Sequence, residues 1–325
     1  MKSADLSSFN RPLQSHQRKQ RGVALITAVM IVAIASVIAT SLMSRQNFDT
    51  LRTSNIIHSD QARIYAQGAE NWIGTELKDD RKKNNYDHLG ENWAAQLPPL
   101  PIEGGYIYGR IEDLQGRINL NNIIDPEQQK RLERLCIELG ISTRFIPALQ
   151  DWIDTDLTQR PNGAEDLTYM SMNPPYRAAN TSMAHPSELL LVQHMNTEDY
   201  EKLLPYITAL PATAAININT APPRVIQSLV PNFTFPEAEQ IAANRVNSPY
   251  QAVNDLAQEP LMQGRTLNPQ LLTTQSEYFL LTTEVELGSA YTVSRTLIHR
   301  SNTGVLTTLH RLQGPSREMI LKAAL

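Results

Sequence analysis

The sequence is poor in the residues on which most enzymes and disulfide-stabilised domains depend. It holds a single cysteine, Cys136, in 325 residues, so no disulfide can form within the chain. This cysteine lies among leucines at helical spacing, which predicts a buried structural thiol. The seven histidines are scattered, and the patterns GxSxG, HExxH and the phosphate-binding P-loop are missing. We therefore expect a protein that is not an enzyme.

Charged residues are also few, at 19%, and they are unevenly distributed around a net charge of −4. The first 22 residues carry a net charge of +4, from five basic residues and one acidic residue: Lys2, Arg11, Arg18, Lys19, Arg21 and Asp5. The remainder of the chain therefore carries a net charge of −8. An acidic body argues against broad binding to nucleic acids or anionic membranes.

Charge is absent altogether from Val23 to Met43. At about 1.5 Å per residue, this run can cross a hydrocarbon core of about 30 Å. A secretory signal is shorter and is cut after its apolar stretch, whereas here Gly22 precedes the stretch. The basic leader should stay cytoplasmic. We expect a single-pass protein of the cell inner membrane with its C-terminal body in the periplasm.

The helical pattern continues beyond the membrane segment to about Lys78. Apolar residues recur there at roughly helical spacing, among them Phe48, Leu51 and Ile64, and no proline interrupts them. We expect an amphipathic periplasmic helix whose apolar stripe contacts partner proteins. The charged residues 79–85 are expected to end this helix as a solvated turn.

The N-terminal pattern resembles a class III (prepilin) signal. This resemblance implies that a prepilin peptidase cuts after Gly22 and that the new terminus, Val23, is methylated. Most members of the pilin family carry Glu at the fifth mature position, where this chain has Thr27. A buried α-amino group is costly unless a carboxylate pairs with it. Because Thr27 cannot supply that carboxylate to a subunit above it, the chain is suited to the tip of a filament.

Strand and helix signals divide the body into a split sheet and a helical interval. Alternating residues predict strands at 106–112, 278–287, 291–300 and 305–312, with a short strand at 115–118. The interval between them predicts helices at 126–139, 142–153, 187–193, 197–204, 223–229, 236–246 and 252–256. The runs Ile118-Asn-Leu-Asn and Ile216-Asn-Ile-Asn echo each other and hint at an internal duplication.

The densest polar cluster begins with Asp151-Trp-Ile-Asp-Thr-Asp and continues at Glu165-Asp166. Loop carboxylates at alternate positions, with more about ten residues later, suit Ca²⁺, which takes 6–8 hard oxygen ligands. The spacing is not that of an EF-hand. The same residues could instead cap helices or line a solvated loop.

Several motifs in this region resemble the K-type minor pseudopilins of the type II secretion system: the Asp151 run, Gly-Ala-Glu165-Asp-Leu-Thr-Tyr, Pro-Pro-Tyr-Arg-Ala-Ala-Asn180 and Ser187-Glu-Leu-Leu-Leu-Val. The resemblance implies an α+β fold with a long N-terminal transmembrane and amphipathic helix and a pilin-like antiparallel sheet interrupted by a large all-α insertion. It also implies a structural calcium site of one or two ions, with six candidate ligands: Asp154, Asp156, Glu165, Asp166, Asp151 and Asn180.

The family further implies a minor pseudopilin at the pseudopilus tip that initiates assembly and supports export of folded proteins from the periplasm across the outer membrane. Its expected partners are the minor pseudopilins I, J and H, the major pseudopilin, the prepilin peptidase and the inner-membrane assembly platform. The expected divisions are 1–22 leader, 23–43 transmembrane helix, 44–80 amphipathic helix, 81–118 first part of the body, 119–276 inserted helical domain, 277–313 C-terminal strands and 314–325 tail.

An alternative function rests on residues 218–256, which resemble a helix-hairpin-helix unit and would make the chain a membrane-anchored DNA-binding or DNA-uptake protein. DNA-binding versions point the backbone N–H groups of a glycine-rich hairpin at phosphate. The corresponding turn here, 230–235, has no glycine and two bulky rings. A packing module is therefore favoured, and no nucleic-acid partner is expected.

Overall fold

The computed structural model describes residues 17–95 and 98–314, with side chains from Val23 onward. Residues 1–16 of the predicted leader and residues 315–325 of the predicted tail lie outside the described residues. The chain divides into two compact units, Met1–His58 and Ser59–Leu325, and each is treated by itself.

Helix α1, Gln17–Lys83, runs through the first unit and into the second. From Val23 onward it is long and apolar enough to cross a membrane, and its apolar window is entirely exposed. Thr27 Oγ1 donates to the carbonyl oxygens of Val23 at 3.1 Å and Ala24 at 3.0 Å. Phe48 and Leu51, two residues of the predicted partner surface, are exposed.

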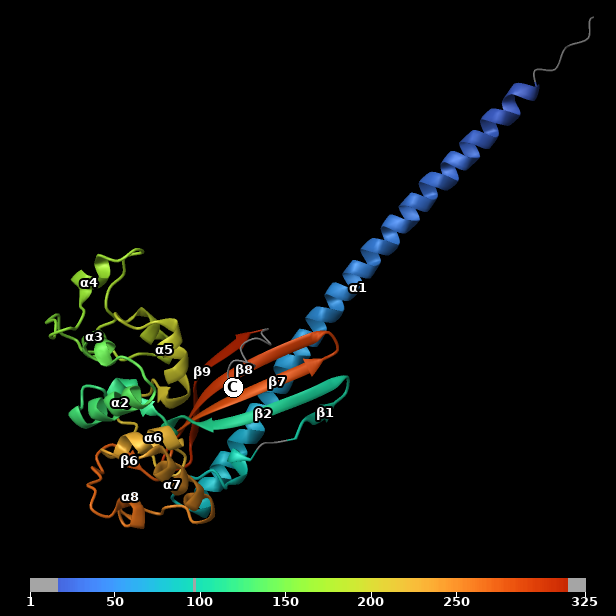
Figure 1. Ribbon diagram of the computed structural model, residues 1–325. Coiled ribbons are helices and arrows are strands. Elements are labelled where there is room, and N and C mark those ends of the chain that lie inside the picture. Colours follow the sequence, from blue (N-terminus) through green and yellow to red (C-terminus); the bar gives the residue numbers. More distant parts are fainter. Residues whose placement is uncertain (1–16, 96–97, 315–325) are drawn as a thin grey trace, which may run out of the picture. The chain divides into compact units, whose positions relative to one another are not determined.

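The second unit is built on a five-stranded antiparallel sheet of order β1-β2-β7-β8-β9 (Figure 1). Its strands are β1 Leu100–Ile102, β2 Gly105–Asp113, β7 Tyr278–Leu287, β8 Ala290–Arg300 and β9 Leu306–Gly314. One side of α1 packs on the sheet through Ile73 and Leu77, which share a core with Phe279 and Ile298. The four long predicted strands are thus confirmed, and the α+β fold class with them.

Two local predictions in this unit are wrong. The predicted strand at 115–118 is a 3₁₀ turn, η2 Leu114–Gly116, because the Asp113 carboxylate accepts from the Gln115 N–H at 2.8 Å and turns the chain. The predicted solvated turn at 79–85 is mostly helix, since α1 runs to Lys83. Asp80 in that stretch is buried, with only 5% of its surface exposed, because Arg300 pairs with it.

Helices fill the interval between β2 and β7 and gather at one end of the strands (Figure 1). Its α-helices are α2 Pro126–Glu138, α3 Ile146–Ile153, α4 Asp166–Met170, α5 Thr197–Leu203, α6 Pro223–Leu229, α7 Phe235–Asn247 and α8 Val253–Ala257. Its 3₁₀ helices include η4 Thr143–Phe145 and η5 Pro186–Leu191. The predicted helix at 142–153 therefore consists of η4 followed by α3, which begins at Ile146. The predicted helix at 187–193 is the 3₁₀ helix η5, and α4 was not predicted.

The insertion consists of two halves with matching hydrogen bonds. Each half is closed by a parallel pair of two-residue strands, β3 Ile118–Asn119 with β4 Ile207–Thr208, and β5 Ile216–Asn217 with β6 Leu272–Thr273. The last Asn of each echoed motif makes the same two bonds: Asn121 to the backbone N–H and C=O of Met183, and Asn219 to those of Tyr250. The predicted duplication is supported by these equivalent contacts.

The two halves share one large apolar core, in which the predicted buried thiol is found. Cys136 has no exposed surface, and burial raises the pKa of its thiol to about 12. Such a thiol stays protonated at neutral pH and is not a reactive nucleophile.

Candidate metal centre

The predicted acidic ligands lie near the end of α3, in the loop that follows it and at the start of the short helix α4. In the first half of the insertion this loop covers residues 154–182, between α3 and Met183. In the second half, only Ser248 and Pro249 separate α7 from the equivalent residue, Tyr250. The acidic residues therefore belong to a loop that is long in only one of the two related halves.

Three of the six predicted ligands converge. Oxygen atoms of Asp154, Asp156 and Glu165 lie within 4.8 Å of one another. Glu165 is 5% exposed, and neither of its carboxylate oxygens has a hydrogen-bond partner within residues 17–95 and 98–314. Burial first, then the neighbouring carboxylates beginning with Asp151, raises the pKa of Glu165 to about 7.

Two further oxygens in this loop are buried without a partner, Asp154 Oδ1 and Asn180 Oδ1. The backbone of Asn180 is held at the end of α3, because its N–H donates to the Trp152 carbonyl at 2.9 Å, two residues before Asp154. Its backbone is in the left-handed region at φ 48°. Unsatisfied buried oxygens cost free energy, so this set is unfavourable unless a proton or a cation joins it.

The other two predicted ligands have partners within the chain. Asp166 accepts from the Ala178 N–H at 3.0 Å, and the Arg177 guanidinium lies 3.9 Å away. Asp151 is fully buried and accepts from the guanidinium of Arg160 at 2.7 Å. Arg160 was missed from the sequence, although it lies between Asp156 and Glu165, because a basic residue within an acidic run does not show which carboxylates it will contact.

The donor set fits a hard divalent cation. Carboxylate and amide oxygens are the ligands that Ca²⁺ prefers, and no sulfur or imidazole would direct the site toward zinc. Glu165, Asp154 and Asp156 would bind the ion, with Asn180 as a further donor, and the ion would supply the positive charge that these oxygens lack. Its role would be to order the loop.

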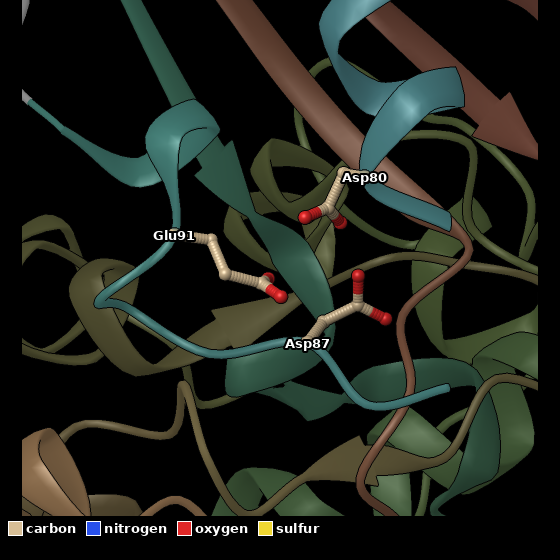
Figure 2. Close-up of side chains that lie close together, drawn as sticks. All are labelled: Asp80, Asp87 and Glu91. Atoms are coloured by element: carbon tan, nitrogen blue, oxygen red, sulfur yellow. The ribbon is translucent and has the colours of Figure 1, made fainter. Parts of the chain in front are cut away.

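A second acidic cluster was not predicted and is shown in Figure 2. Asp80 at the end of α1 and Asp87 and Glu91 in the following loop point their carboxylates toward one another, with oxygens within 4.8 Å. Arg300 lies against the first two: its Nη1 donates to Asp80 at 3.2 Å and its Nη2 to Asp87.

This second cluster is supplied with donors by the chain itself. Glu91 accepts from the Trp93 indole at 2.7 Å, from the His88 N–H at 3.1 Å and from Asn84 at 3.0 Å. Burial, then Glu91 and Asp87, raises the pKa of Asp80 to about 7 against the opposing effect of Arg300. The cluster is therefore a structural ion-pair network and not a metal site.

The helix-hairpin-helix resemblance corresponds to α6, α7 and the turn between them. Phe233 in that turn is buried, and the Arg265 guanidinium lies 4.7 Å from its ring centroid. Arg224 similarly covers Phe235 at 3.9 Å. Because its rings are covered by the chain's own arginines, this turn is packed against protein, as the packing-module interpretation requires.

Comparisons with known proteins decide between the two functions. Two family models described as type II secretion system protein K match residues 116–212 and 216–275, which are the two halves of the insertion. The protein K of Pseudomonas aeruginosa is 32% identical over 315 residues, covering 92% of this chain and 94% of that one. The chain belongs to the type II secretion system protein K family. The protein K of Klebsiella pneumoniae is 31% identical and covers 87% of this chain and 93% of its own length.

A solved structure extends the likeness to the fold. The crystal structure of the GspK-GspI-GspJ complex from enterotoxigenic Escherichia coli matches with a TM-score of 0.70 and 25% identity, over 82% of this chain and all of that one. The protein K assignment confirms the predicted family and fold class. It supports the secretion function over the DNA-binding alternative.

Proposed function

We propose that this protein K caps the tip of a short periplasmic pseudopilus and, with partners equivalent to the I and J proteins of the Escherichia coli complex, initiates its assembly. The support is the relationship to protein K over nearly the full length, together with the solved complex of a relative. The wider partners would be the H and major pseudopilins, the prepilin peptidase and the inner-membrane assembly platform, and the outcome would be export of folded proteins across the outer membrane.

Processing at Gly22 is part of this proposal. Cleavage on the cytoplasmic side would leave Val23 as a methylated N-terminus on a helix that spans the inner membrane, with the body in the periplasm. Mass spectrometry of the purified native protein tests this directly. An N-terminus at any residue other than Val23 would remove the basis of the filament proposal.

Thr27 supports the position at the tip. Its hydroxyl donates to carbonyls of its own helix, and it has no carboxylate to offer the α-amino group of a subunit above. The Val23 amine could still pair with a carboxylate of the subunit below. The chain can therefore be placed on top of a filament but is poorly suited to the middle of one.

The tip proposal therefore depends mainly on Thr27, the uncharged fifth residue of the proposed mature chain, which lies on an exposed apolar helix. The proposal can be tested in a secreting cell. Thr27→Glu should move the protein from the filament end into the shaft, and Thr27→Val is the matched control that keeps the position uncharged. Immunogold labelling of pseudopili reports the position. Tip-only labelling of the Glu variant would contradict the proposal.

The exposed apolar residues Phe48, Leu51 and Ile64 of α1 are the proposed contacts with partner pseudopilins. Phe48→Asp or Ile64→Asp should abolish co-purification with the I and J partners, because each puts a charge into an apolar helix interface. Gln67→Asp, also exposed on α1, is the control and should have little effect. The circular dichroism of the body should stay unchanged in all three variants.

The acidic loop is proposed as a structural Ca²⁺ site with a dissociation constant of about 10⁻⁴–10⁻³ M, as in extracellular modules. Calcium should raise the melting temperature of the full chain in detergent, and EGTA should reverse the shift. Asp154→Ala/Glu165→Ala should abolish the shift. The calcium assignment would be wrong if wild type and this variant responded equally.

A further inference from the structure

Arg160 occupies a position in the acidic loop that the proposed calcium site leaves unexplained. Its Nη1 bridges two carboxylates, donating to Asp151 Oδ1 at 2.7 Å and to Asp154 Oδ2. Its backbone N–H also donates to Asp151 Oδ2 at 3.2 Å. The side chain is one-third exposed, whereas that of Asp151 is fully buried.

Asp151 is fixed in this arrangement by the backbone around it. A Cβ on Gly163 would lie 1.9 Å from Asp151 Oδ2, so the carboxylate needs a glycine at that position. Gln159 closes the same turn by donating to the Gly163 carbonyl at 2.6 Å. Both oxygens of Asp151 thus accept hydrogen bonds from Arg160, which makes Asp151 the buried partner of this guanidinium.

Asp154 is divided between two roles. Its Oδ2 is bound by Arg160, while its Oδ1 is buried and has no hydrogen-bond partner among the described residues. One oxygen of Asp154 lies within 4.8 Å of oxygens of Asp156 and Glu165. A guanidinium that holds one oxygen of a carboxylate orients the other. Arg160 therefore occupies Oδ2 of Asp154 and leaves Oδ1 as the oxygen that can face an ion.

Charge explains why a resident cation is needed. The loop brings together five carboxylates and two guanidiniums, a net −3: Asp151, Asp154, Asp156, Glu165 and Asp166 against Arg160 and Arg177. Arg177 is largely exposed and 3.9 Å from its partner, so Arg160 is the cation that neutralises the buried part. One divalent ion would then bring the loop to −1.

We propose that Arg160 is a resident cation of this loop, which neutralises Asp151 and half of Asp154 and leaves a single divalent site formed by Asp154 Oδ1, Asp156 and Glu165. This inference rests on the proposed calcium site. Arg160 holds the loop together without calcium, and its charge lowers the affinity of the neighbouring site. Calcium binding is thereby kept weak.

The test uses the full chain in detergent, with calcium chloride titrated calorimetrically and melting temperature measured in EGTA. Arg160→Gln should bind calcium roughly 3- to 10-fold more tightly, because a nearby positive charge is removed. In EGTA the same variant should melt at a lower temperature, because Asp151 is left buried without a counter-ion. Arg177→Gln makes the same charge change on the rim and should alter both quantities little.

A second variant separates a charge effect from a folding defect. Asp151→Asn/Arg160→Gln removes both members of the buried pair and should recover most of the melting temperature lost in EGTA. The Arg160 proposal is overturned if Arg160→Gln binds calcium no more tightly than Arg177→Gln, or if the double variant recovers nothing. A wild-type chain that binds no calcium would instead overturn the calcium site itself, and the EGTA measurements would still test the Asp151–Arg160 pair.

Discussion

The two acidic clusters of this protein contain the same kind of side chains and differ in what satisfies them. Asp80, Asp87 and Glu91 receive Arg300, an indole, an amide and backbone N–H groups. In the other cluster, Glu165 accepts no hydrogen bond from the part of the chain that the structure describes, and only one oxygen of Asp154 accepts one. Proximity of carboxylates is common to both, so proximity alone does not identify a metal site.

The useful distinction is whether the chain supplies the donors. A buried carboxylate with internal donors is stable as folded, whereas one without them requires a proton or a cation from solution. The first cluster joins the end of α1, the following loop and the end of β8, and thus serves the fold. The second cluster lies on a loop that only one half of the duplication has, and thus serves a separate purpose.

The largest effect is expected from removing the internal cation of the first cluster. Arg300→Met should lower the free energy of unfolding by about 3–5 kcal/mol, because Asp80 and Asp87 would be left buried without their partner. Denaturant unfolding in detergent measures this by tryptophan fluorescence. Trp93 contributes a signal from this region, since the centroid of its ring lies 5.2 Å from that of Phe279.

The control for this change is a surface arginine of the same sheet. Arg110 pairs with Glu112 at a half-exposed position, so Arg110→Met should cost no more than about 1 kcal/mol. If both variants lost equal stability, Arg300 would have no special role as the cation of a buried network.

Replacing a glutamate by glutamine is expected to change stability in opposite directions in the two clusters when calcium is absent. Glu91→Gln should destabilise the chain by about 1–3 kcal/mol, because an amide nitrogen would face N–H donors that the carboxylate now accepts. In EGTA, Glu165→Gln should raise the melting temperature, because the buried residue no longer carries a charge. With calcium the order should reverse, since only the wild type binds the ion. Destabilisation by both substitutions in EGTA would contradict the distinction.

The pH dependence in EGTA should combine both clusters. The folded-state pKa values of Asp80 and Glu165 are raised to about 7 from 3.8 and 4.5. The folded state therefore holds these protons more tightly, so their contribution to stability is complete below about pH 4 and is lost as the pH rises through about 7. Melting temperature should fall between pH 5 and pH 8.

Single variants assign this slope to its sources. Asp80→Asn and Glu165→Gln should each flatten the slope, and calcium should restore stability at the upper end, where Glu165 is ionised and able to bind it. A melting temperature that rose steadily across this range in EGTA would show that the raised pKa values do not govern stability.

Sequence patterns predicted the elements whose residues lie near one another in the chain. The alternation of Tyr278–Leu287 and the proline that begins α2 are local signals, and both elements occur as predicted. The acidic ligand run was likewise visible, because Asp154, Asp156 and Glu165 are close in sequence. Two similar Asn-containing motifs suggested the duplication. The structure supports it, because Asn121 and Asn219 make equivalent hydrogen bonds to Met183 and Tyr250.

The features that were missed depend on distant partners. Asp80 looked like part of a solvated turn because its partner, Arg300, lies at the end of the last-but-one strand. The missed strand β1 is short and includes Pro101, which removes an N–H donor, and it pairs only at the edge of the sheet. A charged residue is expected to be exposed when only its sequence neighbours are considered. This expectation fails when the fold places a residue of opposite charge beside it, as Arg300 is placed beside Asp80.

The smallest predicted effect concerns Asn180, whose Oδ1 is buried without a partner. Asn180→Gly removes this oxygen, and glycine accepts the positive φ of 48° without strain. Loss of one neutral ligand should weaken calcium binding roughly 2- to 5-fold while changing the melting temperature in EGTA little. Calorimetric titration of this variant beside the wild type measures the difference. Unchanged affinity would restrict the site to its carboxylates, and loss of all binding would mean that Asn180 orders the loop as well as facing the ion.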